Sequence, residues 1–415
     1  MYGLLGEKLG HSFSKEIHES LNQYKYNLIE VKQEDLDSFL KERNFNALNV
    51  TIPYKEKVIP YLYFVDENAQ KIGAVNTIIN KDGKLYGYNT DYLGLGSLLK
   101  KENIDVFGKK VLILGTGGTA KTASVLVKDL GVKEVYKVSR SPKDTNISYD
   151  EAVTIHSDAN VIINTTPCGM YPNDDLVMKL DAFKNLEAIV DVIYNPINTR
   201  LMREAKSKNI KAVNGLYMLV SQAIYASNLF LGIDEAVEEK INKVYKELMN
   251  KKLNIVFIGM PSCGKSTIAS IISEKLNKQL KDTDKNIENI IGMPISSFLN
   301  KDNEQQFRAI ETSVVEEVSK LNNVVVSTGG GVIKNEYNIT CLKRNGIIIF
   351  IDRPLDLLQA TSTRPLSSNK NDLEKLYSER YDLYLKYSDY VVKNDSDIEN
   401  VINKILEVYN ENIGN

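Results

Sequence analysis

The residues with the clearest chemical signature lie at 259–267, where the sequence reads GMPSCGKST. The run fits G-x-x-x-x-G-K-[ST], follows the apolar run IVFI and precedes TIASIISEKL, which predicts a turn between a strand and a helix. Backbone N–H groups of such a turn can surround phosphates. Lys265 would place a cation against the β- and γ-phosphates, and the Ser266 hydroxyl would ligate Mg²⁺. The predicted ATP-binding residues of the turn are Gly259, Pro261, Ser262, Cys263, Gly264, Lys265, Ser266 and Thr267.

A second glycine-rich turn lies at 115–120, between the apolar run VLIL and the helical pattern KTASVLVKDLG. This arrangement is typical of a dinucleotide site. The next strand-like run, EVYKVSR, ends on Arg140, where an NAD enzyme would carry an acidic residue for the ribose 2′-hydroxyl. Arg140 instead suits a 2′-phosphate and favours NADP(H), although it could also be an ordinary loop cation. The predicted contacts are Gly115, Gly117, Gly118, Thr119, Ala120, Ser139, Arg140 and Lys143.

Four polar clusters precede that turn, each just after an apolar run, as expected of loops at strand ends. Their hydroxyls, amides and one Lys–Asp pair suit a polyhydroxylated, anionic small molecule. Taken singly, each cluster could be turn or cap chemistry, and Asp91 could be a helix N-cap. The clusters are GHSFS at 10–14, NVTIPYK at 49–55, GAVNT at 73–77 and NTD at 89–91.

Further polar features follow the turn at 259–267. Asp282 and Asp284 close a strand-like run, where alternate positions would share one face. Arg308 and Glu311 are helix neighbours, so Glu311 could hold the guanidinium, or the two could form a plain surface pair. A glycine triplet at 329–331 allows close approach of a ligand, or is a simple turn. Among the later arginines, Arg364 lies in the polar stretch 362–372 and Arg380 in SERYDLY.

Strand-like and helical patterns alternate along most of the chain, which indicates parallel sheets covered by helices. The alternation pauses at 246–254, a charged stretch that we expect to be poorly structured, and then begins again, so we expect the main boundary near residue 250. The polar stretch 362–372 predicts a mobile loop. The strand-like runs are at 111–115, 161–166, 188–194, 255–259, 324–331 and 347–352.

The composition excludes disordered, collagenous and coiled-coil chains, since 43% of the 415 residues are hydrophobic and 26% are charged. A net charge of -2 gives no global attraction to nucleic acid or anionic membranes. The three cysteines are far apart and the N-terminus does not resemble a signal peptide, so we expect a cytoplasmic protein. The apolar stretch at 212–233 is interrupted by polar residues, which favours a buried helix over a membrane span.

Residues 253–410 resemble the shikimate kinases, on the motifs quoted above and in that order. The resemblance implies that Asp284, Arg308, Gly330 and Arg380 bind shikimate, with both arginines on its carboxylate. It also implies that Asp284 orients the attacking hydroxyl, that Asp282 supports Mg²⁺ through water, and that Arg364 closes over the ATP phosphates. Asn303 stands where the family usually has glycine, and the lid is short.

Residues 1–249 resemble the shikimate dehydrogenases, also through NTTPCGM at 164–170, DVIYNPINT at 191–199 and GLYMLVSQ at 215–222. The resemblance implies Lys55 and Asp91 as the catalytic pair that reduces 3-dehydroshikimate with NADPH, and Gly215 as a cofactor contact. Lys15, Glu19 and Tyr217 depart from the family pattern, and the three histidines are interpreted as structural. The implied substrate contacts are Ser12, Ser14, Thr51, Lys55, Asn76, Asp91, Tyr194 and Gln222.

Both resemblances converge on one metabolite and predict a bifunctional enzyme that uses NADP(H), ATP and Mg²⁺ on small-molecule substrates, without nucleic-acid or membrane partners. The expected fold is α/β: a substrate lobe at 1–100 completed by the helical segment 215–249, a Rossmann-like NADP lobe at 101–214, and a P-loop, nucleoside-monophosphate-kinase-like domain at 250–415. The oligomeric state is left open.

Two alternatives remain at this stage. A non-catalytic sensor would be expected to have lost Lys55, Asp91, Lys265 or Asp284, and all four are present. A quinate-type dehydrogenase fused to another small-molecule kinase fits less well with Arg140 and with the set of Asp284, Arg308 and Arg380.

Overall fold

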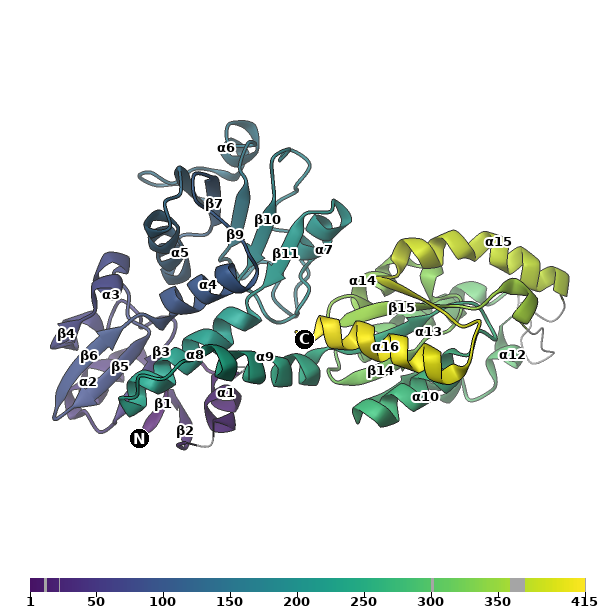
Figure 1. Cartoon of the computed structure of the whole chain (residues 1–415), viewed down its shortest axis with the longest axis horizontal. Coiled ribbons are helices and arrows are strands. Elements are labelled where there is room, and N and C mark those ends of the chain that lie inside the picture. The colour runs from purple at the N-terminus through teal and green to yellow at the C-terminus, as the bar shows by residue number, and fades with distance from the viewer. Residues whose placement is uncertain (11–12, 22, 300–301, 359–369, 415) are drawn as a thin grey trace. The chain divides into compact units, whose positions relative to one another are not determined.

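The computed structural model describes residues 1–10, 13–21, 23–299, 302–358 and 370–414. Within these ranges the chain forms two compact units, Met1–Tyr245 (unit 1) and Lys246–Asn415 (unit 2), shown in Figure 1. Helix α9 (Glu238–Lys252) contains the boundary.

The prediction of a poorly structured stretch at 246–254 was wrong, since all but its last two residues belong to α9 and Asn254 opens a strand. Ile241, Val244 and Leu248 are buried and recur at spacings of three and four. That spacing gives the charged sequence one apolar helix face, which packing can stabilise.

The first sheet of unit 1 has six strands in the order β2-β1-β3-β5-β6-β4. Strands β2, β1 and β3 are parallel, β5 is antiparallel to both β3 and β6, and β4 pairs parallel with β6. The strands are β1 (Tyr2–Gly6), β2 (Tyr26–Glu30), β3 (Ala47–Val50), β4 (Phe64–Val65), β5 (Thr77–Lys81) and β6 (Lys84–Tyr88). The helices along this part are α1 (Ser14–Ser20), η1 (Gln33–Asp35), α2 (Leu36–Glu42), η2 (Ile59–Tyr61), α3 (Glu67–Ile72) and α4 (Thr90–Lys101).

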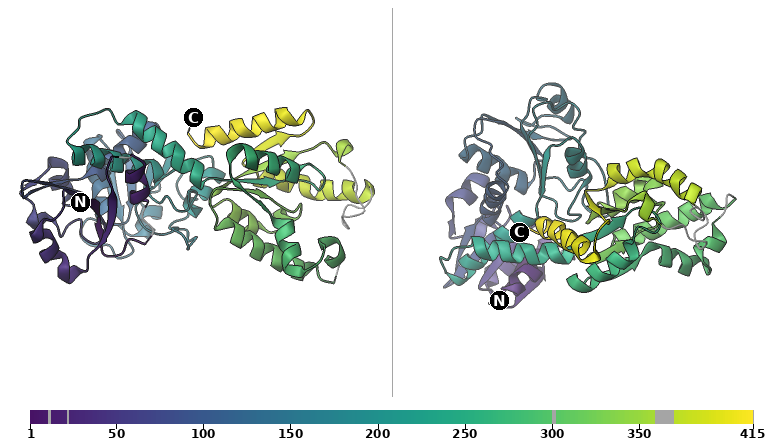
Figure 2. Two further views of the ribbon diagram at one scale, coloured as in Figure 1. Left: turned by 90° about the horizontal axis from the view of Figure 1, so that it is seen from below. Right: turned by 45° about the vertical axis from the view of Figure 1, so that its right-hand side comes forward.

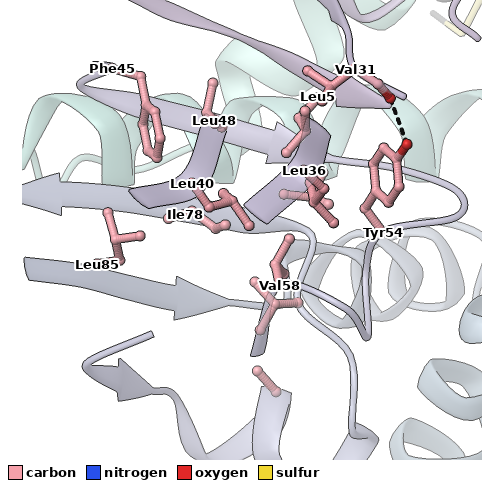
Figure 3. Close-up of a cluster of buried hydrophobic side chains, with 13 residues drawn as sticks. Leu5, Val31, Leu36, Leu40, Phe45, Leu48, Tyr54, Val58, Ile78 and Leu85 are labelled. Atoms are coloured by element: carbon pink, nitrogen blue, oxygen red, sulfur yellow. Dashed lines mark hydrogen bonds between the residues drawn. The ribbon is translucent and has the colours of Figure 1, made fainter. Parts of the chain in front are cut away.

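A buried apolar cluster on this sheet includes Leu5, Leu48 and Ile78 and extends to Tyr54. The Tyr54 ring points into the cluster, and its hydroxyl donates to the carbonyl of Val31 at 2.5 Å (Figure 3). The core therefore anchors the loop after β3 at the residue next to Lys55.

The second sheet of unit 1 is entirely parallel, in the order β11-β10-β9-β7-β8. Its central strands are continuous apolar runs because helices cover both faces. The strands are β7 (Lys110–Leu114), β8 (Glu134–Val138), β9 (Val161–Asn164), β10 (Ala188–Asp191) and β11 (Lys211–Asn214). The helices along this part of the chain are α5 (Gly118–Asp129), α6 (Tyr149–Thr154), α7 (Arg200–Ser207) and α8 (Leu216–Leu231), of which α8 packs against α4, α1 and β5.

Unit 2 is a parallel five-stranded sheet, in the order β13-β14-β12-β15-β16, with helices on both faces (Figure 2). The strands are β12 (Asn254–Ile258), β13 (Gln279–Asp282), β14 (Val324–Ser327), β15 (Gly346–Asp352) and β16 (Tyr390–Lys393). The helices are α10 (Lys265–Leu276), α11 (Thr283–Ile291), α12 (Ile295–Phe298), α13 (Glu304–Ser319), η3 (Val332–Lys334), α14 (Glu336–Leu342), η4 (Leu355–Leu357), α15 (Lys370–Tyr387) and α16 (Ile398–Asn412).

The expected α/β architecture is confirmed: a Rossmann-like parallel sheet in unit 1 and a P-loop sheet in unit 2. Of the loop predicted at 362–372, positions 362–369 lie outside the described residues, and 370–372 are helical. The apolar stretch at 212–233 is divided between β11 and α8. In the described part of the chain, no helix is both long and apolar enough to cross a membrane.

Candidate active sites

Lys55 and Asp91 form an ion pair in unit 1, with 2.6 Å between Nζ and Oδ2. Lys55 lies in the loop after β3, and Asp91 lies in the first turn of α4. The N-cap of α4 is Asn89, whose side chain accepts the N–H of Tyr92 at 3.3 Å. Because Asn89 caps the helix, the Asp91 carboxylate faces Lys55 instead of its own backbone.

A buried hydrogen-bond network supports this pair. Asn76 Oδ1 accepts the backbone N–H of Thr90 at 2.7 Å, and Asn76 Nδ2 donates to the Thr90 hydroxyl at 3.1 Å. Behind it, Asn49 Nδ2 donates to the Thr77 hydroxyl at 3.2 Å and Asn49 Oδ1 accepts the Tyr26 hydroxyl at 2.7 Å. The network fixes the start of α4, and with it Asp91.

The remaining predicted substrate contacts lie on several elements. Ser14 is the first residue of α1 and is buried, and Thr51 follows β3 directly. The ring of Tyr194 meets Phe13 edge-on at 5.5 Å, and burial raises the pKa of Tyr194. Gln222 is buried on α8 and donates to the carbonyl of Leu219 at 2.9 Å. Ser12 lies outside the described residues.

The glycine-rich turn after β7 has the geometry of a phosphate cradle. Gly115 has a φ of 109°, and a Cβ there would lie 2.8 Å from the Thr165 hydroxyl, so only glycine fits. Gly117 is the N-cap of α5 and Gly118 begins the helix; the space around Gly117 is open. A Cβ on Gly118 would lie 3.8 Å from Lys55 Cδ, so the turn adjoins the reactive lysine. Thr119 and Ala120 continue the first turn of α5, with Ala120 buried beneath it.

Arg140 and Lys143 lie after β8 at the same edge of the sheet, and both are exposed. Among the described residues neither forms an ion pair, so both cations are available to an anionic ligand. The neighbouring Ser139 hydroxyl accepts the N–H of Ser141 at 3.2 Å. Gly215 packs directly against the carbonyl of Val192, which gives a structural reason for glycine at that position.

Asp191 is a buried carboxylate to which the sequence assigned no role. It accepts the Thr199 hydroxyl at 2.7 Å, Asn164 Nδ2 at 3.0 Å and the N–H of Ile193 at 3.2 Å. Burial raises its pKa to about 6. Asp191 therefore connects the ends of β9 and β10 and supports the loop that carries Tyr194.

In unit 2, Lys265 lies at the start of α10 and is buried inside its own turn. Its Nζ donates to the carbonyls of Gly259 and Met260, each at 2.9 Å. The turn borders a cavity of about 780 Å³. The cavity is lined, among others, by Pro261, Ser262, Cys263, Gly264, Lys265, Ser266, Thr267, Asp284, Arg308, Glu311, Gly330 and Arg380.

The Ser266 hydroxyl lies 3.3 Å from Asp282 Oδ2, while Asp282 Oδ1 accepts the N–H groups of Asp284 and Lys285. Hydroxyl and carboxylate oxygens fit Mg²⁺, which keeps several waters and phosphate ligands in nucleotide sites. No group of three or more His, Cys, Asp or Glu side chains able to hold a metal occurs in the described part of the chain. The expectation that Asp282 and Asp284 share a strand face was wrong: Asp282 ends β13, and Asp284 lies in α11.

Arg308 and Glu311 do not form a surface pair. Glu311 is 2% exposed, and its Oε2 accepts from Arg308 at 2.8 Å. Burial raises the pKa of Glu311, and the Arg308 guanidinium opposes that rise. Arg380 is also buried and donates to the carbonyl of Gly330 at 3.0 Å, to which the Tyr384 hydroxyl donates at 2.6 Å. The cavity thus joins a P-loop to two arginines and Asp284; Arg364 lies outside the described residues.

Comparison with known proteins assigns a family to each unit. The model of the shikimate dehydrogenase substrate binding domain matches residues 4–78, and the shikimate kinase model matches residues 261–410. The NADP(+) shikimate dehydrogenase of Clostridium perfringens strain SM101 is 42% identical over 269 residues, covering 60% of this chain and 98% of that protein. The chain belongs to the shikimate dehydrogenase family. It also carries a shikimate kinase domain.

Solved structures agree with the dehydrogenase assignment. Shikimate dehydrogenase 1 from Peptoclostridium difficile is 40% identical with a TM-score of 0.55, covering 60% of this chain and 97% of that one. A chorismate mutase/shikimate 5-dehydrogenase fusion from Clostridium acetobutylicum is 40% identical with a TM-score of 0.56, and the match covers 60% of this chain and 96% of that one. In this shikimate dehydrogenase unit, the sequence did not reveal the roles of Asn49, Thr77 and Asp191, because buried polar residues carry no local signal beyond their position at strand ends.

Proposed function

We propose that the chain reduces 3-dehydroshikimate to shikimate with NADPH in unit 1 and phosphorylates shikimate with ATP and Mg²⁺ in unit 2. The observation that carries the proposal is that both units retain a complete reactive group: Lys55 paired with Asp91 beside the glycine-rich turn, and Lys265 in one cavity with Asp284, Arg308 and Arg380.

In unit 1, NADPH bound at the turn of Gly115–Ala120, with Arg140 and Lys143 on its 2′-phosphate, supplies the hydride. The Lys55 ammonium stabilises the oxygen that gains negative charge and gives it a proton. Asp91, whose Oδ2 lies 2.6 Å from Nζ, holds the Lys55 side chain in place. Ser12, Ser14, Thr51, Asn76, Tyr194 and Gln222 are proposed to hold the substrate.

In unit 2, ATP with Mg²⁺ supplies the phosphoryl group. Asp284 accepts the proton of the attacking hydroxyl, and Lys265 and Arg364 stabilise charge on the phosphates. Arg308, Gly330 and Arg380 are proposed to bind shikimate, with Glu311 fixing Arg308. Ser266 and Asp282 are proposed to support the cation.

We also propose the three-lobe division: a substrate lobe at 1–100 with 215–249, a nucleotide lobe at 101–214 and a kinase domain at 250–415. Helix α8, which follows the nucleotide lobe, packs against α4, α1 and β5 of the first lobe, which supports this division. A reducing, cytoplasmic location is favoured by three cysteines that form no disulfide among the described residues, Cys168, Cys263 and Cys341.

The decisive experiment supplies 3-dehydroshikimate, NADPH, ATP and Mg²⁺ and follows NADPH oxidation and ADP formation separately. Lys55→Ala should lower the dehydrogenase kcat by roughly 10²–10⁴-fold and leave phosphorylation of added shikimate unchanged. Lys265→Met should do the converse, by roughly 10²-fold or more. Loss of both activities in either variant would contradict two independent sites, and inactivity of the wild type would favour a sensor.

A further inference from the structure

Asn394 reaches the phosphate-binding turn from a distant part of unit 2. It directly follows β16, and β15 separates β16 from β12, the strand that leads into the turn. Its backbone N–H donates to the carbonyl of Asp352 at the end of β15 at 2.7 Å. Its side chain is buried, and Nδ2 donates to the carbonyl of Cys263 at 2.8 Å.

This hydrogen bond fixes the orientation of one peptide group in the turn. The Cys263–Gly264 peptide is not among the cis bonds of the chain, so its carbonyl and its N–H point in opposite directions. Because the carbonyl points to Asn394, the N–H of Gly264 points away from Asn394. Cys263 and Gly264 both line the cavity.

The packing around this contact depends on glycine. Gly264 has a φ of 94°, and a Cβ there would lie 2.9 Å from Asn394 Nδ2. With Lys265 holding the carbonyls of Gly259 and Met260, three carbonyls of the turn are bound by side-chain donors. A carbonyl released from such a donor could rotate toward a phosphate and replace an attractive N–H dipole with a repulsive oxygen.

We propose that Asn394 is a positioning residue of the kinase unit, which holds the Cys263–Gly264 peptide so that the Gly264 N–H is presented to the β-phosphate of the nucleotide. The proposal rests on the ATP site of the proposed function and adds a residue outside its phosphate-binding motif. It acts on phosphate binding and not on the nucleoside or on shikimate.

The test uses the full chain and measures the Kd of ADP by calorimetry. It also measures the inhibition constant of AMP, which lacks the β-phosphate, against the kinase reaction. Asn394→Ala should raise the Kd of ADP about tenfold, which is the effect of losing about one hydrogen bond to a charged group. It should change the inhibition constant of AMP less than twofold. Asn394→Asp, which places a carboxylate oxygen against the Cys263 carbonyl, should weaken ADP at least as much. The dehydrogenase rate should stay unchanged in both variants.

Asn254→Ala is the matched control. Asn254 is equally buried and donates to the carbonyl of Leu321 at 2.7 Å, but at the opposite end of the sheet. The Asn254→Ala variant should be less stable than the wild type but should bind ADP with unchanged affinity. The inference would be overturned by unchanged ADP binding in Asn394→Asp, by equally weakened binding of ADP and AMP, or by the same loss of ADP affinity in Asn254→Ala. A wild type that binds no ADP would overturn the kinase function itself.

Discussion

At the scale of single residues, the chemistry depends on charges held against partners of the opposite sign. Lys55 and Asp91 are 36 positions apart in the sequence and 2.6 Å apart in the fold. Arg308 and Glu311 pair within one helix, and Glu311 is almost fully buried. Arg140 differs from these cations because it is exposed and forms no ion pair among the described residues, as expected of a residue whose partner is a ligand.

Arg140 should determine the preference for NADPH over NADH. Arg140→Ala should raise the KM for NADPH by about tenfold or more, because a charge-assisted contact with the 2′-phosphate is lost. The KM for NADH, which has no such phosphate, should change less than twofold. Steady-state kinetics with both coenzymes provide the measurement.

Lys133→Ala is the control for that variant, since Lys133 is an exposed cation at the other end of β8. It should leave both constants unchanged. Equal increases of the two KM values in Arg140→Ala would show that Arg140 is an ordinary loop cation.

At the scale of elements, caps and short helices decide which side chains face a site. Asn89 caps α4, so that Asp91 pairs with Lys55 and does not cap the helix. Asp282 caps α11, and Asp284 therefore lies on a helix instead of a strand. Helix α1 contributes a buried histidine to the core. The ring of His18 stacks on Tyr26 at 4.1 Å, and its Nδ1 lies 2.7 Å from the Tyr24 hydroxyl.

His18 should make unit 1 sensitive to acid. Burial lowers its pKa from 6.5 to about 3, so the unfolded chain binds more protons than the folded one between these values. The contribution of His18 to stability is therefore fully present above pH 6.5 and is lost as pH falls, by about 2 kcal/mol from pH 7 to pH 5. In His18→Gln the part of the pH dependence that His18 contributes should disappear.

The pH dependence of stability has to be compared between His18→Gln and the wild type, because Asp191 contributes a pH dependence of the opposite sign. Its raised pKa of about 6 makes its contribution more favourable as pH falls from 6 toward 3.8. Hydrogen exchange of amides in residues 1–245 at pH 7 and pH 5 measures the difference. The same pH dependence in both proteins would exclude His18 as its source.

At the scale of the whole molecule, two compact units share one chain, each with its own parallel sheet and its own glycine-rich turn. Separate cores imply separate cooperative unfolding. Each nucleotide should therefore stabilise only the unit that binds it.

Calorimetry should show two unfolding transitions. NADP⁺ at about 100 times its Kd should raise the midpoint of one transition by roughly 5–10 °C, because about 2.7 kcal/mol of binding free energy is added to one unit. ADP with Mg²⁺ should raise only the other. A single transition that both ligands shift would contradict independent units.

The sequence by itself determined the fold class, the two nucleotide turns and the reactive residues, because glycine spacing, apolar periodicity and charged positions are local properties of the chain. It misjudged 246–254, where helix formation depends on packing of Ile241, Val244 and Leu248, and it placed Asp284 on a strand. Only the tertiary structure brought Asn49 and Thr77 beneath Asn76, Asp191 between two loops and Asn394 onto the P-loop. These are contacts between buried polar groups far apart in sequence, and desolvation makes them strong only after the core has formed.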